Sequence, residues 1–485
     1  MTKQEADWAR LGYEVDAASE HEAAGSRYAL LRNDSGDGLL VTGDAARRFT
    51  PAAADLDGRE AASPWCVAAL TPETAELLMQ AFPWTRPVRR DQRRFSYGMG
   101  DRIDCATPAQ LEAIASYPVF PIFAQQSIRE LQLTRRSFPD VIAAAAFAVF
   151  AADYREGYGA DGDHLKTLSE IDLALDAGCT MITLDCSERI DTTIAGLDRD
   201  ARRQRWQKLP EDVRRHYLDN YADRDYPFIG HIPRSEVERI VLVFHRAIDL
   251  AQEAWEHIRK RGCEVDFELS IDETVQATTP LEHYLIARET SRRGVRLSTV
   301  APHFSGEFEK GLDYIGDTAT FRRELESHQA IAEILGYRLS LHSGSDKFRV
   351  FPHFGAVTSQ AAHVKTAGTN WLEALRVVAV CDPALFRRSL EYAITARPEA
   401  ERYYRVTSRV EEIPVLSEVA DDDLAALVDA PASRQTLHIT YGQLLHEPWF
   451  RVPFFSLLRR EAGHYTTFLT RHTRRHLDAL GLRRS

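Results

Sequence analysis

The sequence predicts an α/β protein built on a (β/α)8 TIM-type barrel, with a small N-terminal α+β region, a helical insertion and a helical C-terminal extension. Two observations predict this fold. Between about residues 94 and 382, short apolar strands alternate with amphipathic helices, and eight such units can be counted. Polar or ionisable side chains follow most of these strands, and a barrel of this type gathers its functional groups at the carboxyl ends of its strands.

The expected strands are short apolar runs bounded by turn residues. They are residues 94–99, 119–124, 157–164, 181–186, 265–270, 296–301, 338–342 and 362–366. The helices expected between them include residues 108–116, 139–154, 168–177, 281–293, 319–335 and 371–380. A strand followed by a helix, repeated eight times, favours a closed barrel over an open sheet.

Three further segments flank or interrupt the barrel. Residues 1–93 are expected to form the α+β region, with strands at 27–32 and 39–42 around a Gly/Asp turn and a helix at 71–82. A charged insertion at 188–261 separates the fourth and fifth strands; we expect helices with an exposed face, which act as a lid. Residues 383–485 are expected to be mostly helical, with a strand at 438–441.

Composition limits the classes of partner. The chain has 485 residues, with 60 Lys and Arg against 72 Asp and Glu, which gives a net charge of −12. This balance argues against nucleic acid, although a local field in a cleft can still attract an anionic small molecule. The longest apolar run, residues 141–152, is too short to cross a bilayer. With six scattered cysteines and no signal peptide, we expect reduced thiols, a cytoplasmic location and no membrane partner. The pattern specifies no oligomeric state.

The strand ends bring together residue types that suit a metal centre. The side chains expected there are Asp101, Arg102, Gln125, Gln126, Asp163, His164, Lys166, Asp185, Glu268, His303, Glu307, His342, Lys347, His363 and Lys365. Imidazole and carboxylate donors without a thiolate suit one divalent cation such as Zn²⁺, Mn²⁺, Ni²⁺ or Co²⁺. We expect His164 and His342 as ligands and Glu307 as the third, with His363 or His303 as alternatives.

The basic side chains at the same strand ends indicate an anionic substrate. Arg102, Lys166, Lys347 and Lys365 would place positive charge at the rim of a net-acidic protein. Such charge suits a substrate that carries a carboxylate or a phosphate.

Two other patterns match known binding motifs but lack the sequence context that those motifs require. Gly157-Tyr158-Gly159-Ala160-Asp161-Gly162 matches the dinucleotide-binding pattern, and Asp185 follows at a suitable distance, but the preceding segment is a predicted helix where the fingerprint needs a strand. His472 and His476 have the i, i+4 spacing of a zinc pair without the adjacent Glu, and we expect them on a solvated helix face.

The strand-end motifs resemble those of a known family. The matching stretches are residues 123–130, 183–188 and 268–274, together with Asp163-His164-Leu165-Lys166-Thr167, Gly306-Glu307-Phe308-Glu309-Lys310-Gly311, His342-Ser343-Gly344-Ser345-Asp346-Lys347 and His363-Val364-Lys365-Thr366-Ala367-Gly368-Thr369. They resemble the tagaturonate/fructuronate epimerases of bacterial hexuronate catabolism.

The resemblance implies a metal-dependent isomerase that inverts C4 of a 2-ketohexuronate, converting D-tagaturonate to D-fructuronate. It also implies an acid/base pair at Asp163 and Glu268, and metal ligands at His164, Glu307 and His342. The residues expected to bind substrate are Arg102, Gln126, Lys166, Asp185, Lys347, His363 and Lys365.

The chemistry of this reaction limits the mechanism. The C4 hydrogen is β to the C2 ketone, so enolate formation does not assist its removal. Two routes remain: transient oxidation at C4 by a nicotinamide, or retro-aldol cleavage of C3–C4 and re-addition to the other face of the aldehyde. A metal with two carboxylates fits the second route. The alternative functions are a metal-dependent aldose–ketose isomerase or aldolase acting on a sugar acid, a nicotinamide-dependent epimerase, and a non-catalytic carbohydrate-binding protein.

Overall fold

Eight parallel strands form a closed barrel at the centre of the computed structural model, which describes residues 13–33, 36–49, 65–90, 95–226, 229–272, 274 and 276–483. The strands are β6 (Phe95–Gly98), β7 (Val119–Ser127), β8 (Gly159–Leu165), β9 (Met181–Asp185), β12 (Asp266–Ile271), β13 (Thr299–Pro302), β14 (Arg338–Leu341) and β15 (His363–Lys365). Each pairs with the next in this order, and β15 closes the barrel against β6. The predicted barrel is confirmed, and each of its strands overlaps a predicted segment.

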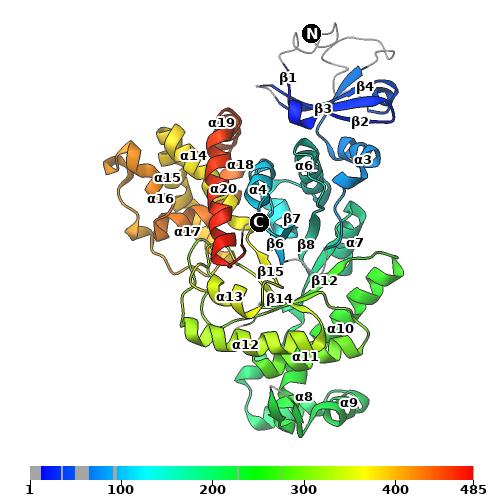
Figure 1. Ribbon diagram of the computed structural model, residues 1–485. Coiled ribbons are helices and arrows are strands. Elements are labelled where there is room, and N and C mark those ends of the chain that lie inside the picture. Colours follow the sequence, from blue (N-terminus) through cyan, green and yellow to red (C-terminus); the bar gives the residue numbers. More distant parts are fainter. Residues whose placement is uncertain are drawn as a thin grey trace.

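Helices cover the outside of the barrel (Figure 1). They are α4 (Thr107–Ile114), α6 (Phe138–Ala151), α7 (Leu168–Ala177), α10 (Arg234–Lys260), α11 (Pro280–Arg292), α12 (Thr318–Leu335), α13 (Phe351–Val357) and α14 (Asn370–Cys381). Capping boxes define where α6, α7 and α11 begin, because a Ser or Thr side chain and an acidic side chain three residues later satisfy free N–H groups of the first turn.

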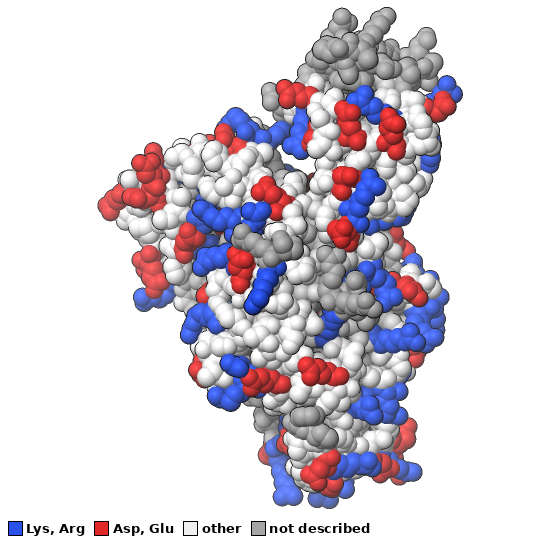
Figure 2. Space-filling model, in the orientation of Figure 1, with Lys and Arg blue, Asp and Glu red and all other residues white. Residues whose placement is uncertain are grey.

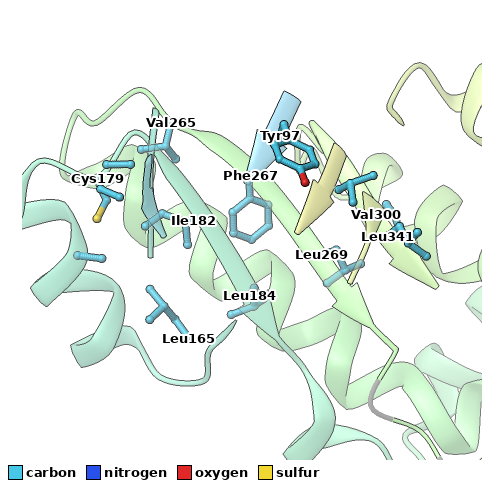
Figure 3. Packing of buried hydrophobic residues seen from close by; sticks show 14 of the residues in the cluster. Tyr97, Leu165, Cys179, Ile182, Leu184, Val265, Phe267, Leu269, Val300 and Leu341 are labelled. Atoms are coloured by element: carbon cyan, nitrogen blue, oxygen red, sulfur yellow. The ribbon is translucent and has the colours of Figure 1, made fainter. Parts of the chain in front are cut away.

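Strand alternation separates an apolar shell from a polar barrel interior. Ile182 and Leu184 of β9, with Phe267 of β12, belong to the apolar core that the barrel shares with its helices (Figure 3). Between these positions, Thr183 donates a hydrogen bond of 3.2 Å to Glu268 inside the barrel. Successive residues of a strand point to opposite faces, so the apolar shell and the polar interior come from the same short strands.

A local irregularity at the end of β8 changes which side chains face the pocket. The register between β8 and β9 shifts between Gly162 and Leu165, and His164 adopts a φ of 55°. A bulge of this kind re-aims side chains, so the consecutive residues Asp163 and His164 both reach the same cavity. The Gly-rich pattern at 157–162 therefore runs into a strand that follows helix α6, and this confirms that its context differs from a dinucleotide-binding turn.

The N-terminal region is a small sheet at one end of the molecule (Figure 1). Its elements are β1 (Glu14–Val15), β2 (His21–Ala23), β3 (Ser26–Arg32), β4 (Gly38–Thr42), β5 (Trp65–Ala69) and α3 (Pro72–Ala81). Both predicted strands and the predicted helix are confirmed, while Asp34 and Ser35 of the predicted turn lie outside the described residues. Phe82, directly after α3, contacts Phe150 of α6 with ring centroids 5.2 Å apart, which ties this region to the barrel.

The insertion at 188–261 is helical, as predicted. It contains α8 (Arg199–Gln207) and α9 (Glu211–Tyr221), a hairpin of β10 (Arg224–Tyr226) and β11 (Gly230–Ile232), and α10. Helix α10 packs against α7 and α11 and so serves as a barrel helix, while α8 and α9 lie at the end of the molecule opposite the N-terminal sheet (Figure 1).

The C-terminal extension is a helical layer beside the barrel (Figure 1). It comprises α15 (Pro383–Ala400), α16 (Leu424–Leu427), α17 (Pro431–Ile439), α18 (Tyr441–His446), α19 (Pro448–Arg460) and α20 (Ala462–Ala479). These helices share a second apolar core with α14, in which Trp371 contacts Phe450 and Phe454. The strand predicted at 438–441 is wrong, because these residues end α17 and begin α18. Packing against α14 and α15 overrides the weak local preference of this short segment.

Acidic and basic side chains are interspersed over the face shown in Figure 2. None of the helices among the described residues combines the length and the apolar character needed to cross a bilayer.

Candidate active site

A cavity of about 640 Å³ opens at the carboxyl ends of the barrel strands. The strand-end residues that line it include Arg102, Gln125, Asp163, His164, Lys166, Asp185, Asp272, His303, Glu307, Lys310, His342, Lys347 and Lys365. The C-terminal extension supplies Tyr403, Tyr404, Arg405 and His438 to the same wall. The cavity therefore lies where the sequence predicts it, although part of its wall comes from a segment to which the sequence assigned no role.

Two imidazoles and one carboxylate converge at this cavity. His164 and His342, from the ends of β8 and β14, have ring centroids 4.9 Å apart. Asp272, directly after β12, places Oδ2 3.2 Å from Nδ1 of His342, and one ligand atom from each residue lies within 4.8 Å of the others. The structure thus brings together the two histidines expected as ligands.

A buried carboxylate fixes the orientation of His342. Nε2 of His342 lies 2.7 Å from Oε1 of Glu268, while Nδ1 points to the cavity side, 3.2 Å from Oδ2 of Asp272. Glu268 does not line the cavity; its Oε2 accepts a 2.6 Å hydrogen bond from Thr299 inside the barrel. Metal-binding histidines usually direct their second nitrogen to such a carboxylate, so this arrangement leaves Nδ1 as the donor for a cation.

One ammonium group joins three carboxylates beneath the histidines. Nζ of Lys365 lies 2.9 Å from Asp161, 2.6 Å from Asp163 and 2.9 Å from Glu268. Burial would raise the pKa of Asp163, but His164 and Lys365 outweigh burial and hold it well below its ordinary value. Burial dominates at Asp161, where it raises the pKa to about 6 despite Lys365. Asp163 is therefore an ionised carboxylate that faces the cavity.

The charges around His342 favour an additional cation. Burial lowers the pKa of this imidazole, yet Asp272 and Glu268 raise it to about 10. The surrounding carboxylates are thus only partly compensated by Lys365. Two imidazoles and a carboxylate, with no thiolate, are donors that suit Zn²⁺, Mn²⁺, Ni²⁺ or Co²⁺. The residues present fit one divalent cation held by His164, Asp272 and His342.

Asp272 was not predicted as a ligand, although a signal for it exists in the sequence. It is an acidic residue immediately after the strand that ends at Ile271. Glu307, the expected third ligand, also lines the cavity, but its carboxylate pairs with Arg405 at 2.8 Å and does not join the three-residue group.

The other predicted lysines occupy different environments. Lys166, on the cavity wall, lies 3.5 Å from Asp185 and 3.3 Å from Glu188. Lys347 is buried and donates hydrogen bonds to three backbone carbonyls of residues 309, 312 and 345. Burial lowers the pKa of its ammonium to about 7. Lys347 thus holds the loop that follows β13 against the loop that follows β14.

Two of the predicted substrate-binding residues do not reach the cavity wall. His363 is buried inside the barrel, where Nδ1 lies 2.9 Å from Oγ of Ser96. Gln126 is also buried, whereas its neighbour Gln125 lines the cavity. His303, an alternative ligand, lines the cavity and places Nδ1 3.1 Å from Oγ1 of Thr274.

The two C-terminal histidines are not on a solvated face. His476 is 1% exposed, and it accepts a 2.9 Å hydrogen bond at Nε2 from the backbone N–H of Asp346 while Nδ1 faces the carbonyl of His472 at 2.9 Å. His472 places Nε2 3.2 Å from Asp346, which also pairs with Arg434. The solvated-face interpretation is wrong, because these residues clamp α20 and α17 to the loop after β14.

The expected lid is not part of the wall. No described residue of 188–261 lines the cavity, and the extension contributes Tyr403, Tyr404 and Arg405 there instead. Tyr403 ends a short helical turn (Glu401–Tyr403), and Tyr404 and Arg405 follow it, in a segment without any motif that marks a binding role.

Comparison with known proteins identifies the family. The sequence model of the tagaturonate epimerase family (UxaE) matches residues 17–480. The chain belongs to the tagaturonate epimerase family. Among the relatives of this epimerase, the tagaturonate/fructuronate epimerase of Thermotoga maritima is 34% identical over 476 residues, covering 97% of each chain. The crystal structures of fructuronate-tagaturonate epimerase UxaE from Cohnella laeviribosi, native and with glycerol, are 40% identical and superpose with a TM-score of 0.93 over 100% of each chain. The predicted resemblance is confirmed, and the protein is an isomerase of the carbohydrate-epimerase type.

Proposed function

We propose that this epimerase interconverts D-tagaturonate and D-fructuronate by inverting C4, with a divalent cation and retro-aldol chemistry. The observation that supports this most directly is the adjacency of the His164–Asp272–His342 group to the ionised carboxylate of Asp163 in one cavity. The relatives described above are named as epimerases of tagaturonate and fructuronate, which supports the choice of substrate.

In this proposal His164, His342 and Asp272 hold the cation, with Glu307 on the same wall as the alternative third ligand. A divalent cation bound there would supply Lewis-acid polarisation of the substrate ketone. Its identity is Zn²⁺, Mn²⁺, Ni²⁺ or Co²⁺, since the donors are nitrogen and oxygen.

Asp163 accepts the proton of the C4 hydroxyl group. As this proton leaves, the C4–O bond becomes a carbonyl, the C3–C4 bond breaks, and its electron pair moves toward C2 and C3. The products are a three-carbon enediolate and a three-carbon aldehyde acid. When the aldehyde turns its other face and C3–C4 forms again, Asp163 returns the proton to the new C4 alkoxide. No C–H bond is broken.

Glu268 takes part through its neighbours, because it does not line the cavity. Lys365 contacts both Asp163 and Glu268, so its ammonium links the two carboxylates of the expected acid/base pair. Glu268 stabilises the proton on Lys365 and orients His342, while Asp163 makes the contact with substrate.

The deciding experiment incubates metal-loaded and chelator-treated protein with D-tagaturonate in deuterated water and follows the product by NMR. We expect D-fructuronate only from the metal-loaded protein, with no deuterium at C4. Stoichiometric deuterium at C4 would exclude the retro-aldol route. A product whose carbonyl group has moved to another carbon would indicate an aldose–ketose isomerase. Accumulation of two three-carbon fragments would indicate an aldolase, and absence of any product would indicate a carbohydrate-binding protein. Release of a nicotinamide from the denatured protein would support the oxidative route.

A further inference from the structure

His438 on α17 is a buried histidine with unused hydrogen-bonding capacity. Its side chain is 2% exposed, lines the cavity, and has no hydrogen-bond partner at Nδ1 or Nε2. Both nitrogens of a buried imidazole normally find partners, since an unsatisfied polar atom costs about 1–3 kcal/mol. Both ring nitrogens are therefore available for hydrogen bonds to a ligand in this cavity.

Arg102 presents a second unpaired donor at the same place. Its Nε donates to Glu130 at 3.0 Å, its guanidinium lies 4.1 Å above the ring of Tyr441, and Nη1 is buried without a partner. A Cβ atom at Gly368 would lie 2.4 Å from Nε2 of His438 and 3.5 Å from Nη1 of Arg102. The two donors thus converge beside Gly368, where the chain carries no side chain.

Positive charge dominates this part of the wall. Lys310 donates a 3.1 Å hydrogen bond to Ser343, the residue that follows His342, and Arg129 lies 4.9 Å above the ring of Tyr404. Glu130 is the carboxylate that pairs with Arg102 here. Burial, Arg102 and Lys310 hold the pKa of His438 well below its ordinary value, so this imidazole is neutral and can donate one hydrogen bond.

A carboxylate is the substrate group that matches these donors. Its two oxygens accept hydrogen bonds from a guanidinium, an ammonium and an imidazole N–H, and its charge compensates the excess positive charge of the wall. An uncharged hydroxymethyl group would leave the positive charge that Glu130 does not balance without a counter-charge.

We propose that Arg102, Lys310 and His438 form the subsite for the C6 carboxylate of the substrate, and that this subsite retains the aldehyde acid while C3–C4 is broken. This inference rests on the proposed function. The C2 ketone and the C6 carboxylate lie at opposite ends of a hexuronate, so a ketone held at the His164–Asp272–His342 group leaves the carboxylate for a separate basic subsite. With the carboxylate fixed, rotation about C4–C5 is sufficient to present the other face of the aldehyde.

The subsite also gives the C-terminal extension a function. Neighbouring residues of α17 bind the barrel loops: Arg434 pairs with Asp346, and Gln435 donates to Glu309 at 2.8 Å. These contacts position His438 relative to the strand ends. The extension therefore completes the cavity instead of only covering the barrel.

The test uses full-length, metal-loaded protein and two matched variants, His438→Leu in the subsite and His446→Leu on an exposed turn of the same extension. D-glycerate, which carries the three-carbon acid skeleton of the fragment, is titrated calorimetrically against glycerol, its uncharged counterpart. We expect the wild type and His446→Leu to prefer D-glycerate, and His438→Leu to bind it about tenfold more weakly. The KM for D-tagaturonate should rise by a similar factor, with metal content unchanged.

Lys310→Met serves as the second subsite variant if His438→Leu fails to fold, and the same loss of D-glycerate affinity is expected. Equal D-glycerate affinity in the wild type and the folded subsite variant, or no preference over glycerol in the wild type, would overturn the inference. A wild type that prefers D-glycerate but does not convert D-tagaturonate would instead contradict the proposed function.

Discussion

Nε2 of His342 lies 2.7 Å from Oε1 of Glu268, so a carboxylate outside the cavity determines which nitrogen of the ring faces into it. Lys365, 2.9 Å from the same oxygen, extends this contact to Asp163. The cation site and the proton-transfer site are thereby parts of one hydrogen-bonded network. A substitution at any residue of this network should therefore lower both metal affinity and kcat. The relative size of these two losses shows whether the residue mainly supports the cation or mainly supports proton transfer.

Substitution of Asp272 tests which carboxylate is the third ligand. We expect Asp272→Asn to lose most of its bound metal, because the amide has no negative charge to offer the cation. Glu307→Gln is the matched control, since Glu307 lines the same cavity but pairs with Arg405. Metal content per chain, measured by mass spectrometry after dialysis, gives the result. Full metal in Asp272→Asn and loss in Glu307→Gln would assign the third ligand to Glu307.

Glu268→Gln tests the support of His342. The amide oxygen can still accept a hydrogen bond from Nε2, but the charge that interacts with His342 and Lys365 is removed. We expect metal affinity to fall by roughly 10–100-fold, as for other carboxylates behind a metal-binding histidine, and kcat to remain low at saturating metal. Recovery of full kcat at high metal concentration would show that Glu268 has no part in proton transfer.

The sequence predicts the barrel well because each strand is a short apolar run followed by a polar residue and a helix. It also predicts His164 and His342 at the strand ends, since those positions converge in any barrel of this type. Asp272 also stands at the end of a barrel strand, but so does Glu268, four residues earlier, and either carboxylate could face the cavity on the sequence alone. Only the structure shows that Glu268 points into the barrel below the cavity.

The positions of residues that tertiary packing determines could not be predicted from the sequence. The bulge at Asp163 and His164 follows from the pairing of β8 with β9, which no local pattern specifies. His438 lies more than 70 residues beyond the last barrel strand, in a segment that the sequence assigned to a strand. His476 is buried because α20 packs against the loop after β14, and an i, i+4 pattern gives no information on which face of a helix is covered.

Lys365→Met tests how strongly the buried ammonium stabilises the fold. It would leave Asp161, Asp163 and Glu268 without their shared cation, and breaking a buried pair typically costs about 3–5 kcal/mol. We expect a lower free energy of unfolding in urea. Asp161→Asn in the same chain removes one uncompensated charge, so the double variant should recover part of the loss. A double variant less stable than Lys365→Met would show that carboxylate repulsion is not the cause.

A buried histidine pair should make stability depend on pH. Nδ1 of His283 lies 2.9 Å from Nδ1 of His328, and Nε2 of His283 lies 2.6 Å from the hydroxyl of Tyr337. Burial lowers the pKa of His328 to about 4 and that of His283 well below its ordinary value. Both rings are therefore neutral in the folded protein at pH 7, and one Nδ1 must donate to the other.

The sign of the effect follows from these lowered values. Below pH 6.5 the unfolded chain binds protons at both histidines while the folded chain does not, so the free energy of unfolding falls as the pH falls toward 4. For His328 alone the loss over this range is roughly 3 kcal/mol. Urea unfolding between pH 7 and pH 4 measures it. His328→Phe should reduce the pH slope, whereas His446→Phe, an exposed control, should leave it unchanged. A slope that is the same in the wild type and His328→Phe would mean that other groups cause the pH dependence.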